Sequence, residues 1–139
     1  MNLYLDIDGV LLANDKQAAL HAEEFIAYAV TQFPVYWLTT HCRNRGDDPV
    51  PMLTRFFAGP TLTHLKHIRP SYWDMMKTEA IDFTQPFLWF DDDLFDEERD
   101  SLIRNNAFDS WVEVDLANDE TQLQREIVRL TDIVSKARV

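Results

Sequence analysis

Short apolar runs alternate along this chain with segments whose apolar residues recur at helical spacing. The runs have the length and composition of buried strands, and the periodic segments have those of amphipathic helices. Strands that alternate with helices form right-handed βαβ units, which assemble into a parallel sheet with helices on both faces. A length of 139 residues suits one folded unit. We therefore expect a single α/β domain spanning residues 1–139.

The expected elements follow from these patterns and from the prolines that interrupt them. Strands are predicted at Leu3–Ile7, Val35–Leu38, Phe87–Phe90 and Trp111–Val114, with a weaker one at Pro60–Leu65. One helix is marked by Ala18, Ala22, Phe25, Ile26, Ala29 and Phe33, and a closing helix by Leu123, Ile127, Leu130, Val134 and Ala137. Asp119 and Gln122 are placed like a capping box before the closing helix. The unpatterned segment His41–Pro51 predicts a loop at the carboxyl end of a strand, where open α/β sheets bind ligands.

Composition restricts the compartment and the partners. The formal net charge of −11 gives a field that repels nucleic acid and anionic membranes, although a local basic groove stays compatible with it. The single cysteine excludes an internal disulfide and favours a reducing compartment. The N-terminal stretch lacks a basic region and is interrupted by Asp6 and Asp8, unlike a signal peptide or a membrane span. We expect a cytoplasmic protein without a membrane partner.

Two predicted strands end abruptly in carboxylates. Asp6 and Asp8 follow the first strand, and Asp91 and Asp92 follow Phe87–Phe90. Taken alone, the first pair fits a turn with solvated aspartates equally well, and the acidic run at 96–100 fits an ordinary helix start. A helix start explains the second pair less well, because it abuts the apolar strand directly. Since the carboxyl ends of parallel strands share one edge of the sheet, up to four carboxylates are expected to meet there.

Such a cluster requires a cation. Two unit charges 4 Å apart repel by about 4 kcal/mol at a surface-like dielectric. With ligands that are all oxygen, magnesium is the expected ion, and the four histidines lack the spacing of a zinc site. The three glycines are isolated, which excludes a P-loop and a dinucleotide fingerprint. Phosphate chemistry in this chain would therefore depend on charged side chains and a metal.

A hydroxyl and an amine complete the set of candidate groups. Thr39 and Thr40 end the Val35–Leu38 strand, and Lys77 lies just upstream of Phe87–Phe90. Taken singly, a strand-end threonine closes a turn and a lysine lies on the surface more often than either serves a site. The order of all four features along the chain favours a shared site over these separate structural roles.

That order resembles the four-motif layout of the haloacid dehalogenase superfamily. LYLDIDGVLL resembles its first motif, VYWLTT its second, Lys77 its third and FLWFDD its fourth, so the resemblance spans residues 3–92. It implies a Rossmann-like three-layer sandwich and a magnesium-dependent phosphohydrolase, that is, a phosphatase. The tryptophans of the second and fourth segments also resemble those of phosphatase-type domains in RNA-repair proteins.

The resemblance assigns roles to the aspartates. Asp6 would attack phosphorus and form an aspartyl-phosphate, and Asp8 would protonate the leaving oxygen and then activate water. Asp91 and Asp92 would hold magnesium together with Asp6 and the backbone carbonyl of Asp8. These roles suit phosphoryl transfer, which depends mainly on positioning and charge neutralisation.

The resemblance assigns the second and third motifs less firmly. Thr39 would orient the phosphoryl group, with Thr40 as the alternative. Lys77 would neutralise Asp6 and the phosphoryl charge, with Lys66 as the alternative.

One departure from the superfamily concerns the cap domain that its members often carry. The segments Leu12–Phe33 and Thr40–Met76 are too short to form one, so we expect a capless domain with an open site. An open site suits a large phosphorylated substrate, such as a polynucleotide end or a phosphoprotein. His41, Arg43 and Arg45 follow the second motif and are expected to bind substrate at the rim, a solvated loop being the alternative.

Two other functions use similar residues. A receiver-like switch domain accepts a phosphoryl group on a similar cluster, but its acidic pair opens the sequence and its acceptor lies on a later strand. Here a DxD pair opens the chain and a DD pair closes the series, which favours the hydrolase. A catalytically idle binding domain with the same fold is the other alternative.

Overall fold

The computed structural model describes residues 1–42 and 47–138, which form an α/β fold around a four-stranded parallel sheet. The strands are β1 (Asn2–Leu5), β2 (Val35–Trp37), β3 (Phe87–Asp91) and β4 (Trp111–Glu113). Their order is β2-β1-β3-β4, and each neighbouring pair is parallel. This confirms the α/β class and the four strongly patterned strands that the sequence predicts.

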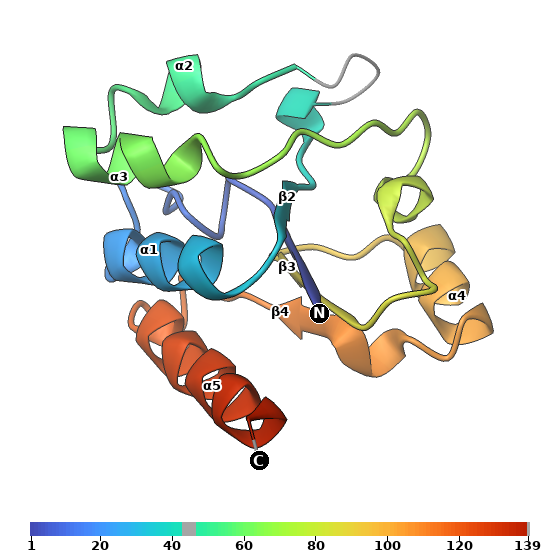
Figure 1. Cartoon of the computed structure of the whole chain (residues 1–139). Helices are drawn as coiled ribbons and strands as arrows, with labels where there is room; N and C mark the ends of the chain where they lie inside the picture. Colours follow the sequence, from blue (N-terminus) through green and yellow to red (C-terminus); the bar gives the residue numbers. More distant parts are fainter. Residues whose placement is uncertain (43–46, 139) are drawn as a thin grey trace.

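Helices connect the strands and cover the sheet. They are α1 (Ala22–Gln32), α2 (Val50–Leu53), α3 (Gly59–Leu65), α4 (Asp96–Arg104) and α5 (Gln122–Ala137), with 3-10 turns η1 (Thr40–Cys42), η2 (Lys77–Ala80) and η3 (Phe108–Ser110). Figure 1 shows α1, α3 and α5 on one side of the sheet and α4 on the other. Among the described residues, no helix has both the length and the apolar character needed to cross a membrane.

The hydrophobic core lies on both faces of the sheet. Leu3 and Leu5 of β1 belong to the cluster beneath α1 and α5, whereas Tyr4 belongs to a second cluster that includes Leu102 of α4. The alternation follows from the strand period of two, and burial of both faces explains why β1 and β3 are almost wholly apolar. Packing on two sides fixes the two central strands, and with them the carboxyl edge where the acidic residues lie.

The weaker strand predicted at Pro60–Leu65 is wrong, because this segment is helix α3. Pro60 lies in the first turn of α3, where its fixed φ suits a helix and its missing N–H is not needed. Thr61 and Leu65, four residues apart, are buried on one face of the helix. A short apolar run without clear alternation cannot be assigned by its periodicity alone.

The capping box predicted for the closing helix is also wrong. Helix α5 begins at Gln122, whose side chain instead accepts from the Asp115 backbone N at 2.8 Å and donates to the Glu113 carbonyl at 2.7 Å. Asp119 forms an ion pair with Arg125. The end of β4 thus uses the glutamine to hold the start of α5.

The chain turns directly after β1, whereas the sequence predicts a strand as far as Ile7. The Ile7 carbonyl accepts hydrogen bonds from the backbone N of Leu11 and Leu12, at 2.9 and 3.0 Å. Ala18 pairs with Leu12 in an isolated bridge, so α1 starts at Ala22 and later than its periodicity indicates. The first acidic pair therefore lies at the start of a turn rather than along an extended strand.

Candidate active site

Three carboxylates meet at the carboxyl edge of the sheet. Asp6 follows β1, Asp91 ends β3 and Asp92 comes next in the chain. Parallel pairing aligns Leu5 with Phe90 and so brings Asp6 beside Asp91. One ligand oxygen from each of the three aspartates lies within 4.8 Å of the others. Asp6 and Asp91 are buried and Asp92 is exposed, so the cluster opens to solvent on one side.

Lys77 of η2 reaches this cluster. Its Nζ lies 2.7 Å from Asp91 Oδ2 and 3.3 Å from Asp6 Oδ2, and its side chain is only 12% exposed. The buried Glu98 of α4 holds the turn that carries the lysine. One oxygen of Glu98 accepts from the Lys77 backbone N at 3.0 Å, and the other accepts from the Phe95 backbone N at 3.1 Å. The amine is thereby delivered to a fixed position between two carboxylates.

The cluster holds more negative than positive groups. Burial opposes a charge on Lys77, but the carboxylates of Asp6 and Asp91 outweigh it and raise the lysine pKa. Burial and the charge of Asp6 raise the pKa of Asp91 to about 8, and burial also raises the pKa of Asp92. When ionised, three carboxylates and one ammonium leave two negative charges. A divalent cation would balance them, and a donor set made wholly of carboxylate oxygens is the type that magnesium prefers.

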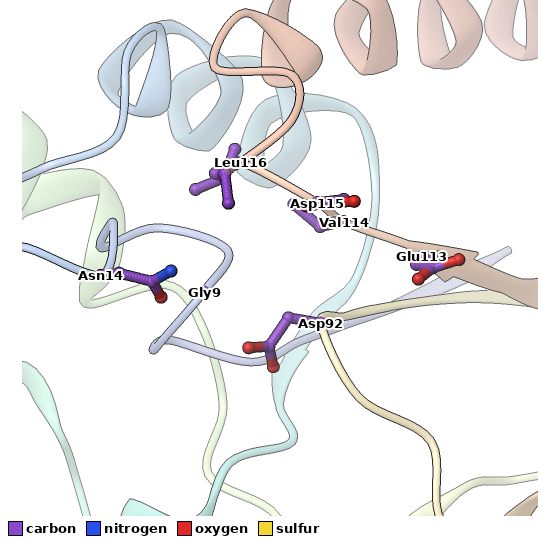
Figure 2. Close-up of a pocket in the computed structure, with 8 residues that line it drawn as sticks. Gly9, Asn14, Asp92, Glu113, Val114, Asp115 and Leu116 are labelled. Atoms are coloured by element: carbon purple, nitrogen blue, oxygen red, sulfur yellow. The ribbon is translucent and has the colours of Figure 1, made fainter.

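Gly9 allows Asp92 to approach the turn after β1. Its φ is +83°, a conformation that residues with a side chain rarely adopt. A Cβ at this position would overlap the Asp92 carboxylate. Figure 2 shows the Asp92 carboxylate directed towards the turn that carries Gly9. Both residues line a cavity of about 270 Å³. Glu113 and Asp115 also line this cavity, so it is acidic.

Asp8 has a different environment from Asp6. Its side chain is 49% exposed, and its carboxylate contacts His41 Nε2 at 3.0 Å and Lys16 Nζ at 3.8 Å. Among the described residues, the cluster of three carboxylates does not include Asp8. The two aspartates of the first pair therefore differ in their burial and in their ionic partners. Asp6 lies in the ionic cluster with Lys77 and Asp91, and Asp8 lies half-exposed beside two basic side chains.

The candidates from the second and third motifs are placed unequally. Thr39 is fully buried, and its hydroxyl accepts from the His41 backbone N at 3.4 Å, whereas Thr40 is exposed in η1. Lys66 is exposed at the end of α3, while Lys77 lies in the cluster. The structure therefore brings Lys77 rather than Lys66 to the aspartates. The rim residues Arg43 and Arg45 lie outside the described residues.

The sequence does not predict the roles of Glu98 and Lys16. Glu98 belongs to the acidic start of α4, and its inward orientation follows only from the helical phase that buries it with Ser101 and Leu102. Lys16 lies in an unpatterned turn, and nothing in the sequence connects it with Asp8. Comparison of the chain with protein-family models, with curated proteins and with solved structures finds no match.

Proposed function

We propose that this chain is a magnesium-dependent phosphohydrolase of the haloacid dehalogenase type, which hydrolyses phosphomonoesters through an aspartyl-phosphate on Asp6. One observation carries the proposal: Lys77 contacts both Asp6 and Asp91 at a carboxyl sheet edge that also holds Asp92. A nucleophile, a cation and two further carboxylates are the parts that this chemistry requires. The proposal includes a Rossmann-like three-layer sandwich for the domain.

The reaction would proceed in two steps. A carboxylate oxygen of Asp6 attacks phosphorus, the bond from phosphorus to the leaving oxygen breaks, and Asp8 donates a proton to that oxygen. Asp8, now ionised, takes a proton from water as the water oxygen attacks phosphorus, and the bond from phosphorus to the Asp6 oxygen breaks. Inorganic phosphate leaves and both aspartates return to their starting states. Lys77 neutralises charge on Asp6 and on the phosphoryl oxygens, and its anchoring by Glu98 fixes it for that role.

Asp6, Asp91 and Asp92 would hold magnesium, with Asp8 contributing its backbone carbonyl. When bound, the metal supplies positive charge that offsets the phosphoryl oxygens and the crowded carboxylates. The Asp8 carboxylate stays free of this cluster and beside His41, which suits a group that must exchange protons. Thr39, which is buried, would orient the phosphoryl group, and the exposed Thr40 is the alternative.

An open, capless site in a cytoplasmic protein is part of the proposal. The elements between β2 and β3 are small, with four residues in α2 and seven in α3, which supports the absence of a cap. A site without a cap suits a large substrate such as a polynucleotide end or a phosphoprotein. His41, Arg43 and Arg45 would bind that substrate at the rim.

Turnover of an aryl phosphate tests the proposal. Hydrolysis is expected with magnesium and should be lost with EDTA or in Asp6→Asn. A stable aspartyl-phosphate without turnover would support a receiver-like switch instead. Absence of both turnover and phosphoenzyme would support an idle binding domain. Full activity in EDTA would refute the role of the metal.

A further inference from the structure

A second cavity, of about 480 Å³, opens beside Asp8. Leu12, Met52 and Phe56 give it an apolar wall, and Lys16, His41 and Arg55 give it a basic rim. Its volume lies in the range of small-molecule sites. The wall comes from the turn after β1 and from the region of α2, so two segments distant in sequence form it.

The position of the cavity connects it with the leaving group. The inference rests on the proposed function, in which Asp8 protonates the leaving oxygen. Asp8 lines this cavity and contacts two members of its rim, His41 at 3.0 Å and Lys16 at 3.8 Å. The alcohol that leaves must therefore emerge beside Asp8, where the cavity can accept it.

Charge also favours this cavity over its neighbours. Lys16 and Arg55 outnumber Asp8 within it, although the chain as a whole carries a formal net charge of −11. Two other cavities border Asp92, and both are rich in carboxylates, one with Glu113 and Asp115 and the other with Asp93, Asp96 and Glu113. A phosphate ester is repelled by those two acidic cavities and attracted by the basic rim.

The wall selects the kind of leaving group. Leu12, Met52 and Phe56 offer no hydrogen-bond donor for the hydroxyls of a sugar, and the methionine sulfur is only a weak acceptor. The guanidinium of Arg55 lies 5.7 Å from the centroid of the Phe56 ring, an arrangement in which a cation and an aromatic face attract each other. A flat aromatic group fits both surfaces, because its face packs on apolar side chains and also attracts a guanidinium.

We propose that the substrate is a phosphomonoester whose alcohol carries an aromatic ring, and that this ring binds in the cavity formed by Leu12, Met52 and Phe56. A nucleoside and a phenol are the two sources of such an alcohol. The phosphoryl group then lies at Asp6 while the ring lies beyond Asp8. Small metabolites with purely hydroxylated leaving groups are poor substrates.

Three substrates with magnesium test this proposal: a nucleoside monophosphate, 1-naphthyl phosphate and glycerol phosphate. The nucleoside monophosphate and glycerol phosphate both release an alkyl alcohol, so their kcat/KM values compare the ring rather than the leaving-group chemistry. We expect at least tenfold higher kcat/KM for the nucleoside monophosphate. Phe56→Leu keeps apolar volume and removes the ring, and it should lower kcat/KM about tenfold for the two aromatic esters, in line with one stacking contact. Glycerol phosphate should be unaffected.

Arginine variants supply the matched control. Arg55→Ala should weaken turnover of the aromatic esters, and this exposed position decides the matter if Phe56→Leu fails to fold. Arg99 also lies over a phenylalanine ring, that of Phe108 at 5.7 Å, but it lines an acidic cavity. Arg99→Ala should be silent.

Binding gives a readout that does not need turnover. In a calorimetric titration, the free nucleoside should bind to the wild-type protein, and its affinity for Phe56→Leu should be about tenfold lower. Three results would each overturn the inference and leave the phosphatase proposal intact. They are equal kcat/KM for all three substrates, equal losses on all three substrates in Phe56→Leu, and a loss in Arg99→Ala that matches the loss in Arg55→Ala. Failure to hydrolyse any ester refutes the proposed function, and the inference with it.

Discussion

Replacing Lys77 by methionine removes a largely buried ammonium that contacts both Asp6 and Asp91. When Asp91 and Asp6 are both ionised, the attractions of Lys77 to them across 2.7 and 3.3 Å are about 6 and about 5 kcal/mol at an effective dielectric near 20. Most of this offsets the cost of burying the charges, so breaking such a buried cluster typically destabilises a protein by about 3–5 kcal/mol. The raised pKa of Asp91 limits the loss, because that carboxyl can take up a proton.

Catalysis should suffer separately from stability. Loss of one preorganised charge aimed at the transition state costs about 10²–10³ in kcat. Magnesium should restore the fold of Lys77→Met, because the added cation balances the buried carboxylates of Asp6 and Asp91 that have lost the lysine, but it should not restore the rate. Thermal melts with and without magnesium separate these two effects, and steady-state kinetics on an aryl phosphate measure the second.

Lys66→Met is the matched control, since Lys66 is exposed at the end of α3. It removes the same charge and should change neither the melting temperature nor kcat appreciably. A fully active Lys77→Met protein, or a larger loss in Lys66→Met, would refute the assignment of Lys77 as the catalytic cation.

Three further outcomes are expected. Gly9→Ala should lower both the melting temperature and magnesium affinity, because its Cβ overlaps the Asp92 carboxylate and its φ of +83° is strained; unchanged magnesium binding by calorimetry would contradict this. Without metal, the folded protein keeps a proton on Asp91 that the unfolded chain loses near its ordinary pKa of 3.8, so stability should fall as pH rises from 4 to 8. Magnesium should therefore raise the melting temperature more at pH 8 than at pH 5, and Asp91→Asn should abolish that difference. Cys42 is fully buried, and burial raises its thiol pKa to about 11, so native protein should resist a thiol reagent that labels the unfolded chain rapidly.

The parts of the fold that the sequence predicts are those with a strong local pattern. The run Phe87–Phe90 is wholly apolar and lies between a proline and a run of aspartates, which favours a buried strand and marks where it ends. The strand predicted at Pro60–Leu65 is wrong because so short a segment fits a strand or a helix equally well until its packing partners are known. The capping role predicted for Gln122 is wrong because the backbone at the end of β4 binds its side chain instead.

The site shows the same division between local and tertiary information. The two acidic strand ends are visible in the sequence, and parallel pairing then requires that they meet. The choice between Lys77 and Lys66 depends on which lysine the fold brings to the aspartates. Glu98, 21 residues away from Lys77 in sequence, holds the turn that carries Lys77. The sequence does not predict a site at Lys16 and Phe56, because these residues line one cavity only once the turn after β1 and the region of α2 pack together.

Locating the phosphoryl group on the protein tests the central claim most directly. Asp8→Asn should slow hydrolysis of the phosphoenzyme, since it removes general acid–base help that is typically worth about 10²–10⁴-fold. An aryl phosphate with a good leaving group can still load the nucleophile of this variant in the presence of magnesium. After an acid quench, mass spectrometry of the peptides should find one phosphoryl group on Asp6, and none in the double variant Asp6→Asn with Asp8→Asn. A phosphoryl group on Asp91 or on a serine, or rapid turnover by Asp6→Asn, would contradict the account.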